Sequence, residues 1–347
     1  MTHRETKQKA TQQKSRMMAI VQDGYGKPEQ VLRLDEIDVP TVGDDEVLVR
    51  MHATSVNTPD WITVAGIPYF VRLQAGLRRP RSLVRGSDVA GVVELVGENV
   101  TNLKAGDLVW GSWWTGSLST PGTFAELSVG PASQLATKPA GLTFEEAGAS
   151  VMSGLTALVA IRDLGRAGPG RSILINGASG GVGTFAIQIA KSFGAEVTGV
   201  CSTRNVALVE SLGADHVVDY TKQDFTRGDR RYDVILDNVM NHRPSVTTRV
   251  LARGGTFIPN SVGDKGGLFA GLPRMAGAAL VGLGQTDVRF AGDWVPPSQE
   301  NLAALAELFE SGAIKVVIDE VYPLHEAGRA VAHMLGHHAR GNIVLSM

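Results

Sequence analysis

Short apolar runs of strand length dominate the first part of the chain, from Met17 to about Pro139. Clusters of Gly, Asp and Asn separate these runs, which is the pattern of strands joined by turns. The clearest predicted strands span residues 18–21, 46–53, 88–96 and 124–129. This part is therefore predicted to be a β-rich domain.

From about Ala140 the apolar positions change to an alternation of strands and helices. Strands are predicted at residues 172–176, 197–201, 217–219, 234–236 and 256–258. After the first strand, an apolar stripe with helical spacing is formed by Val182, Phe185, Ala186, Ile189, Ala190 and Phe193. A second helix is predicted at residues 206–212. Strands that alternate with helices form parallel βαβ units, so we expect a doubly wound parallel sheet of the α/β class.

The chain beyond residue 292 has no βαβ partner of its own. It is predicted to form a helix at 299–310, a strand at 316–318, a further helix and a strand at 342–345. We expect this segment to return to the first domain. The predicted organisation is a disordered tail at 1–16, a substrate domain at 17–139 and 293–347, and a dinucleotide-binding domain at 140–292.

A glycine-rich turn lies between the strand at 172–176 and the helix that follows it. It reads Gly177-Ala178-Ser179-Gly180-Gly181-Val182-Gly183. Small residues at this place let backbone N–H groups approach a pyrophosphate, and the helix N-terminus adds donors and a favourable dipole. An ordinary tight turn in a parallel sheet is the alternative, but the flanking strand and helix favour dinucleotide binding.

The end of the next strand indicates which dinucleotide is bound. An NAD-specific site usually offers a carboxylate there for the ribose diol, but no Asp or Glu occurs between positions 197 and 209. Ser202, Thr203 and Arg204 instead provide hydroxyl and guanidinium donors that suit a 2′-phosphate. We therefore predict NADPH, with Arg204 as a solvated residue at a helix start as the alternative. Tyr220, after the third strand, either contacts the same phosphate or packs as a half-buried strand residue.

Composition and charge exclude several other classes of protein. With 33 basic and 35 acidic residues the formal net charge is -2, so no global field attracts nucleic acid or an anionic membrane. No apolar run in the sequence is long enough to predict a membrane span. Cys201 is the only cysteine, which rules out an intrachain disulfide and a multi-cysteine zinc site and favours a cytoplasmic location. The polar, basic residues 1–16 lack the apolar segment of a secretory signal.

Several segments occur in the order found in a known family. The chain carries GSDVAGVV from residue 86, GDLV from 106, GTFAE from 122, GLTA from 154, NGASGGVG from 176, LGADHVVDY from 212 and RGNIV from 340. With these motifs it resembles the medium-chain dehydrogenase/reductase superfamily over nearly all of residues 17–347. The resemblance implies a Rossmann-type sheet with a GroES-like β-rich domain, an active site in the cleft between them, and a homodimer.

The resemblance is to a branch of this superfamily that works without zinc. Zinc alcohol dehydrogenases carry a cysteine where this chain has Val56-Asn57-Thr58-Pro59-Asp60, and Gly-His-Glu where it has Gly86-Ser87-Asp88. A catalytic zinc needs about three protein ligands, and no such set occurs at suitable places, so we predict no metal site. The chain therefore resembles the zinc-independent quinone oxidoreductases, in which hydride adds to an acceptor that is already electron-poor.

The same resemblance implies roles for individual residues. Asn57 would donate to the substrate carbonyl or to the cofactor amide; Asp60 would act in catalysis or instead cap the helix that follows; Tyr69 would donate a proton or form a wall of the pocket. The cofactor-binding residues that the resemblance implies beyond the glycine turn are Thr156, Asn238, Asn260, Val262 and Asn342. A glycine often follows the segment at Asp237 in the family, and this chain has Met240 there.

A basic cluster precedes the GSDVAGVV motif and is formed by Arg72, Arg78, Arg79, Arg81 and Arg85. We interpret it as a solvated loop, with a contact to phosphate, CoA or an acidic partner as the alternative.

The predicted function is the NADPH-dependent, metal-free reduction of quinones or other conjugated carbonyls. The expected partners are a small quinone or enone and a second copy of the chain, with neither nucleic acid nor a membrane span. One alternative is a reductase of enoyl thioesters or enones. The other is a non-catalytic protein that binds NADPH.

Overall fold

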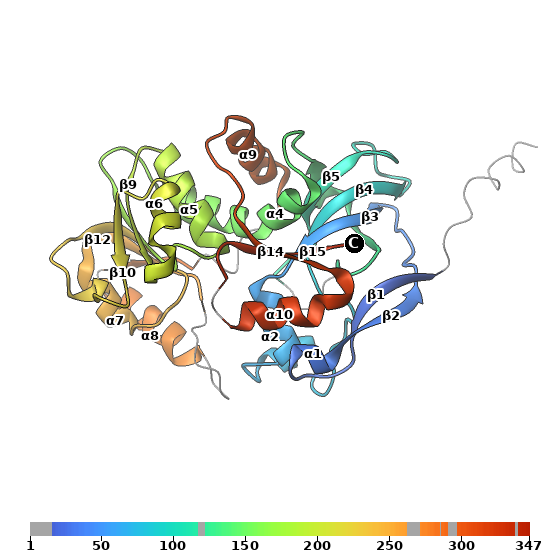
Figure 1. Cartoon of the computed structure of the whole chain (residues 1–347), viewed down its shortest axis with the longest axis horizontal. Coiled ribbons are helices and arrows are strands. Elements are labelled where there is room, and N and C mark those ends of the chain that lie inside the picture. The colour runs from blue at the N-terminus through green and yellow to red at the C-terminus, as the bar shows by residue number, and fades with distance from the viewer. Residues whose placement is uncertain (1–15, 117–121, 262–270, 285, 291–296, 337–338) are drawn as a thin grey trace, which may run out of the picture.

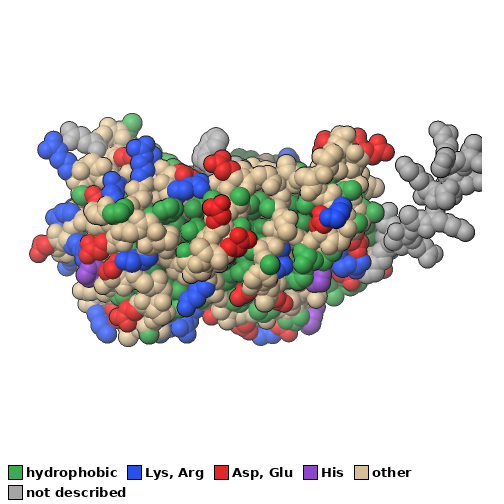
Figure 2. All heavy atoms as spheres, turned by 90° about the horizontal axis from the view of Figure 1, so that it is seen from above, with side chains coloured by type: hydrophobic (Ala, Val, Ile, Leu, Met, Phe, Trp, Pro, Cys, Tyr) green, Lys and Arg blue, Asp and Glu red, His purple; other side chains and the backbone are tan. Residues whose placement is uncertain are grey.

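The computed structural model describes residues 16–116, 122–261, 271–284, 286–290, 297–336 and 339–347. Two sheets form the two halves of the molecule, one around β9 and β12 and the other around β3 and β4, with helices α4 and α9 between them (Figure 1). On the face shown in Figure 2, acidic and basic side chains are interspersed.

The cofactor-type half is a parallel sheet of six strands among the described residues, in the order β10-β9-β8-β11-β12-β13. Counted from β8, this is the doubly wound order 3-2-1-4-5-6, so the prediction of a Rossmann-type sheet is confirmed. The strand bounds are Ser172–Asn176 (β8), Glu196–Cys201 (β9), His216–Asp219 (β10), Tyr232–Asp237 (β11), Leu251–Pro259 (β12) and Asp287–Val288 (β13). The helices of this half are Gly181–Ser192 (α5), Val206–Ser211 (α6), Pro244–Thr247 (α7) and Leu272–Gly282 (α8).

The other half is a mainly antiparallel sheet in the order β14-β15-β3-β4-β5-β7, with β6 paired to β3. Its strands are Glu46–Ser55 (β3), Asp88–Val96 (β4), Leu108–Ser112 (β5), Leu127–Pro131 (β6), Leu135–Thr137 (β7), Ile318–Pro323 (β14) and Asn342–Ser346 (β15). An antiparallel pair, Arg16–Gln22 (β1) and Leu32–Asp38 (β2), lies beside it, together with Pro28–Val31 (α1), Thr58–Ala65 (α2), Val71–Ala75 (α3) and Ala327–Leu335 (α10). This is the GroES-like arrangement expected from the motifs.

The C-terminal segment does return to this half. Strand β15 pairs antiparallel with β3, with Val344 opposite Ser55. The predicted strand at 316–318 is wrong, because β14 begins only at Ile318. Val316 and Val317 are apolar because they pack against the main core, and the Val317 carbonyl accepts a hydrogen bond from Asn342 N (2.9 Å) at the start of β15.

A continuous apolar core joins the two halves. Helix α4 (Phe144–Leu158) runs through it, and a capping box begins this helix: Thr143 Oγ1 accepts from Glu146 N, and Glu146 Oε2 accepts from Thr143 N. From α9 (Gln299–Glu310), Phe309 packs edge-on against Trp110 of β5 and Phe185 of α5, each 6.1 Å away between ring centres. Because side chains from both halves share this core, the two halves are packed directly against each other.

One helical stretch among the described residues, Phe144–Leu164, is long and apolar enough to cross a bilayer, but 72% of its apolar 18-residue segment is buried in the protein. Its apolar character is therefore explained by packing in the core.

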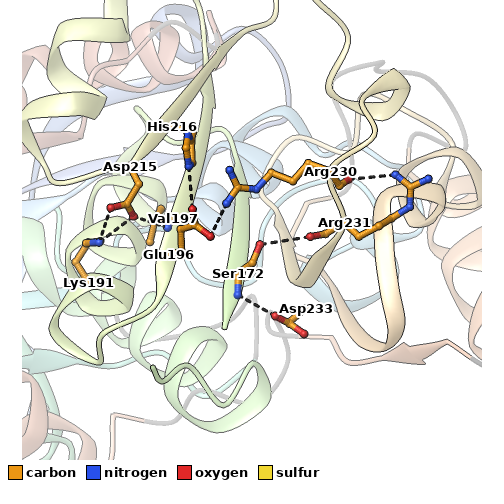
Figure 3. A network of polar contacts seen from close by, with 9 residues as sticks. All are labelled: Ser172, Lys191, Glu196, Val197, Asp215, His216, Arg230, Arg231 and Asp233. Carbon is orange, nitrogen blue, oxygen red and sulfur yellow. Dashed lines mark hydrogen bonds and ion pairs between the residues drawn. The ribbon is translucent and has the colours of Figure 1, made fainter. Parts of the chain in front are cut away.

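A polar network ties together the amino ends of the parallel strands (Figure 3). Lys191 Nζ pairs with Asp215 (2.8 Å), and Glu196 pairs with His216 (2.9 Å) and Arg230 (2.5 Å). Ligands of doubly wound sheets bind at the opposite, carboxyl edge. This network therefore stabilises the sheet at the edge away from the candidate site.

Candidate cofactor and substrate site

The glycine turn leaves β8 and opens α5 as predicted. Gly177 takes a φ of +79°, which side-chain-bearing residues rarely adopt. A Cβ on Gly183 would lie 2.2 Å from the Gly177 carbonyl oxygen, and one on Gly181 would lie 2.4 Å from Asn342 Oδ1. Only glycine therefore fits at position 183, where the near atom belongs to the backbone, whereas a side chain at position 181 would have to displace the Asn342 amide.

The turn has the chemistry of an anion site. The first turn of α5 contains no acidic residue, and its N–H groups have no partner within the helix. The turn is held in place from two sides: Ser179 Oγ accepts from Asn205 Nδ2 (2.9 Å), and the Ser179 carbonyl accepts from Gly341 N (2.8 Å). A pyrophosphate would therefore meet prearranged donors here.

The ends of β11 and β12 bring two predicted residues to the same edge of the sheet. Asn260 Nδ2 donates to Asn238 Oδ1 (2.8 Å), whereas the buried Asn238 Nδ2 has no hydrogen-bond partner among the described residues. A buried donor without a partner costs free energy, so it fits a ligand carbonyl or hydroxyl. Predicted Val262 lies outside the described residues, and Thr156 lies half-buried in α4.

Met240 takes the conformation that a glycine would favour. Its φ is +56° and its side chain is fully buried. Its N–H donates to Asp237 Oδ1 (2.8 Å), which also accepts from Asn176 Nδ2 (2.7 Å). Burial raises the pKa of Asp237 despite these donors. The loop after β11 is thus shaped by hydrogen bonds to Asp237, and the absence of glycine does not prevent its formation.

The ribose end contains a carboxylate that the sequence prediction missed. The Thr203 hydroxyl donates to Asp219 Oδ2 (2.6 Å), and Lys222 Nζ lies 3.2 Å from the same oxygen. The Thr203 hydrogen bond, with those of Thr221, holds the pKa of Asp219 well below its usual range. Asp219 comes from the end of β10 rather than β9, so a search confined to positions 197–209 could not find it.

The other predicted residues at this end lie together. Arg204 is exposed in the 3₁₀ turn Thr203–Asn205 that precedes α6, and Ser202 is half-buried just before this turn. Tyr220 has 54% of its surface exposed, and its N–H donates to the Cys201 carbonyl (3.0 Å). Lys222 therefore supplies positive charge beside the ionised Asp219, and Arg204 directly follows Thr203, which donates to this carboxylate.

At the substrate end, Asn57 and Asp88 form a buried cluster with Ser55. Asn57 Nδ2 donates to Ser55 Oγ (2.9 Å) and to Asp88 Oδ2 (2.9 Å), and Ser55 Oγ donates to the same Asp88 oxygen (2.6 Å). Both amide hydrogens of Asn57 are thus used within the protein. Burial raises the pKa of Asp88 to about 6, although these hydrogen bonds oppose the shift. The predicted donation from Asn57 to a substrate would require this cluster to rearrange.

Asp60 holds the local backbone together. Its Oδ2 accepts from Asn57 N (2.7 Å) at the start of α2, and its Oδ1 accepts from Gly86 N (3.0 Å) just before β4. Burial raises the pKa of Asp60 to about 7, against the effect of these donors and of nearby Arg85. Asp60 is therefore positioned both to shape the site and to hold a proton near neutral pH.

A small cavity of about 10 Å³ lies beside Asp60, with Thr63, Arg85, Ser87 and Trp114 in its wall. Its volume is roughly that needed by one water molecule. Ser87 is 2% exposed, and its Oγ has no hydrogen-bond partner among the described residues. In the sequence, Ser87 stands out only because zinc dehydrogenases carry Gly-His-Glu where this chain has Gly86-Ser87-Asp88.

The predictions for Tyr69 and for the arginine cluster have different outcomes. Tyr69 is 46% exposed, and its ring packs 4.5 Å from the Arg72 guanidinium. Among the described residues, Tyr69 forms no hydrogen bond with Asn57 or Asp60. Arg85 is 5% exposed, so the interpretation of the arginine cluster as a solvated loop is wrong for this member: its charge is drawn inward toward Asp60.

Known proteins share both halves of this architecture. Residues 43–140 match the family described as "Alcohol dehydrogenase GroES-like domain", and residues 212–345 match the family described as "Zinc-binding dehydrogenase". A chloroplastic quinone-oxidoreductase of Triphysaria versicolor is 33% identical, over 95% of this chain and 98% of its own. A 2-methylene-furan-3-one reductase of Solanum lycopersicum is 32% identical, over 93% of this chain and 79% of its own.

The fold agrees with these relatives. A solved structure of the Escherichia coli quinone oxidoreductase complexed with NADPH has a TM-score of 0.78 and 25% identity, covering 95% of this chain and 100% of that one. The chain belongs to the medium-chain dehydrogenase/reductase superfamily. Within it, the chain falls in the quinone oxidoreductase-like branch, and it is an oxidoreductase of the NAD(P)H-dependent type.

The name of the matched family raises the question of zinc in this superfamily member. The positions that carry ligands in zinc dehydrogenases hold Asn57, Ser87 and Asp88, and two of these are hydrogen-bonded to each other. Across the part of the chain that the structure describes, no three His, Cys, Asp or Glu side chains form a group that could hold a metal ion. The residues at this place do not fit a tetrahedral zinc ion.

Proposed function

We propose that this reductase uses NADPH to reduce quinones or other conjugated carbonyls without a metal ion. The observation that carries the proposal is the pairing of a dinucleotide-type turn with a substrate end whose zinc positions hold Asn57, Ser87 and Asp88. Bound NADPH supplies a hydride, and one proton from the protein or solvent completes the two-electron reduction of the acceptor. The relatives that reduce quinones and a furanone support this class of acceptor.

The residues of the turn and the strand ends would hold the cofactor. The N–H groups at the start of α5 would bind the pyrophosphate, and Asn238 Nδ2 would donate to the nicotinamide half. Arg204, Lys222 and the hydroxyl groups at the end of β9 would bind the 2′-phosphate. Asp219, which is paired with Lys222, opposes this binding, because its negative charge repels the phosphate that the cations attract.

Titration with NADPH and NADH tests the cofactor assignment. Arg204→Ala should lower the preference for NADPH by about 1–3 kcal/mol if a charge-assisted contact to the phosphate exists. Arg249→Ala, an exposed arginine in the same half, serves as the control for a nonspecific change in charge. An unchanged preference in Arg204→Ala would contradict the assignment.

The cavity beside Ser87 is where we place the acceptor oxygen. Charge develops on this oxygen as hydride adds to the conjugated carbon, and a prearranged donor stabilises it. The Ser87 hydroxyl is a buried donor with no partner among the described residues, and Asp60 lies in the same cavity wall with a pKa of about 7. Ser87 would donate to the developing oxyanion, and Asp60 would supply the proton.

Reduction of an enoyl thioester is the second candidate. The furanone reductase among the relatives acts on a conjugated carbonyl, by its name, and hydride addition to an enone uses the same donor at the oxygen. Initial rates with NADPH and either a benzoquinone or a short enoyl-CoA would separate the two. Saturable turnover of the thioester alone would reject the quinone proposal, and turnover of neither with tight NADPH binding would indicate a non-catalytic protein.

We also propose that two copies assemble through β13. This strand ends the parallel sheet among the described residues and is paired only with β12. Backbone groups on such an edge can pair with a second copy. Light scattering after gel filtration would give twice the chain mass, and a monomer at micromolar concentration would reject the dimer.

A further inference from the structure

A surface segment next to the substrate end, residues 69–83, combines exposed apolar side chains with arginines. We call it the arginine lip. Its large apolar residues and their exposed fractions are Tyr69 46%, Phe70 46%, Leu73 68%, Leu77 68% and Leu83 45%. Single exposed apolar residues are common, but five within one short segment form a patch that usually marks an interaction site.

The charge of the lip has one sign only. Residues 61–87 contain five arginines and no Asp or Glu, in a chain whose net charge is -2. Arg78, Arg79 and Arg81 are exposed, and no described carboxylate forms an ion pair with them. The even mixture of charges on the face in Figure 2 is therefore not found here.

Hydrogen bonds to the main body hold the lip in place. Tyr25 Oη donates to the Gly76 carbonyl (2.5 Å), and Arg72 Nε donates to the Gly66 carbonyl (3.0 Å). Within the lip itself, Arg81 N donates to the Ala75 carbonyl (2.7 Å). The apolar side chains are thus exposed on a backbone that is fixed to the protein, so their exposure does not result from a loose end.

We propose that the arginine lip docks the enzyme on the surface of an anionic lipid bilayer. Transfer of leucine and phenylalanine side chains from water to the boundary between headgroups and acyl chains lowers the free energy, and arginines beside them are attracted to anionic headgroups. A flat lipid surface matches a patch that mixes exposed apolar groups with unpaired arginines and lacks any acidic residue. An acidic protein would satisfy the arginines but would leave Leu73 and Leu77 without an apolar partner.

The lip adjoins the cavity beside Ser87, because Val84 and Arg85 line that cavity. Docking would place the substrate end near the lipid phase. The inference of membrane docking does not depend on the proposed reaction, and it is tested without turnover.

Flotation of the full chain with vesicles provides the test. Vesicles of phosphatidylcholine with one quarter phosphatidylglycerol are compared with vesicles of phosphatidylcholine alone, at low and at high salt. We expect binding to the anionic vesicles that weakens with salt. Arg78→Gln/Arg79→Gln/Arg81→Gln should lower the partition coefficient by roughly a hundredfold at low salt, since each arginine near such a surface contributes roughly fivefold. Leu73→Ser/Leu77→Ser should lower it by at least about tenfold.

Matched controls separate docking from a general change in charge or stability. Arg227→Gln/Arg249→Gln/Arg253→Gln removes the same charge from exposed positions in the other half, and it should leave binding within about twofold. Thermal melting of each variant shows whether it is folded. Absence of flotation, equal flotation with neutral vesicles, equal loss in the control triple variant, or binding to polyglutamate alone would each overturn the proposal.

Discussion

Ser87 and Ser128 are a matched pair for testing the oxygen site, since each is 2% exposed. The Ser87 hydroxyl has no hydrogen-bond partner among the described residues. The Ser128 hydroxyl accepts from Trp113 Nε1 (2.9 Å) and donates to the Gly122 carbonyl (2.8 Å). Replacement by alanine therefore removes no described hydrogen bond at position 87 and two at position 128.

The two replacements should have opposite consequences. Ser87→Ala should change the free energy of unfolding by less than about 1 kcal/mol, because no protein hydrogen bond is lost. If the hydroxyl donates to the developing oxyanion, kcat should fall by ~10²-fold or more, which corresponds to about 3 kcal/mol of the activation barrier. Ser128→Ala should lower the free energy of unfolding by about 1–3 kcal/mol, because Trp113 Nε1 loses its acceptor, and should leave kcat within about threefold.

The assay is the single-turnover oxidation of NADPH, followed by absorbance with a quinone in excess. Single turnover is used because slow product release could hide an effect on the chemical step. A donor that acts only in the transition state lowers the single-turnover rate constant by the same factor at every quinone concentration, whereas a binding role would raise only the quinone concentration needed for half of the maximal rate. A Ser87→Ala enzyme that reduces the quinone within twofold of the wild-type rate would refute the reasoning.

Three further predictions concern the cofactor half. Gly183→Ala places a Cβ 2.2 Å from the Gly177 carbonyl oxygen, so it should lower the free energy of unfolding by ~2 kcal/mol or more and abolish NADPH binding, as measured by fluorescence titration. The control Gly141→Ala, where a Cβ meets open space, should change neither property. Normal NADPH binding by Gly183→Ala would contradict the close fit of the turn. Met240→Gly relieves the strain of a φ of +56°, which should add ~1 kcal/mol to the free energy of unfolding, but it removes a fully buried side chain, which should subtract ~2–5 kcal/mol. Urea unfolding should therefore show a net loss of stability, and a net gain would mean that the backbone strain outweighs the burial. Arg230 and His216 hold the pKa of Glu196 below its usual range. Their interaction with the Glu196 carboxylate therefore stabilises the fold at pH values above the ordinary carboxylate pKa, and this stabilisation is lost as the pH falls through the lowered pKa. At pH 7 Glu196→Gln should cost less than ~1 kcal/mol, since the side chain is half exposed, and the difference should vanish in strong acid; a difference that persists at pH 2 would exclude an electrostatic origin.

Local pattern was enough to predict the elements that carry the cofactor. Strand β8, the turn and α5 are consecutive in the chain, and apolar spacing together with glycine at 177–183 specifies them without reference to distant residues. The same holds for β4 and for α9, whose bounds agree with prediction. At Val316 and Val317 the apolar side chains are explained by burial in the core and not by pairing of the backbone with another strand, so the prediction of a strand there was wrong.

The substrate end was decided by contacts between residues that are far apart in the chain. Asp60 joins α2 to the backbone at Gly86, and Asp219 joins β10 to the end of β9, so neither role has a signature in its own segment. The burial of Arg85, and the lack of a hydrogen-bond partner for Ser87 in the part of the chain that the structure describes, likewise depend on what packs around them. Sequence periodicity records which face of an element is apolar, because that is a local property. Which polar atoms are left with or without partners depends on the whole packed interior, and only the tertiary structure determines it.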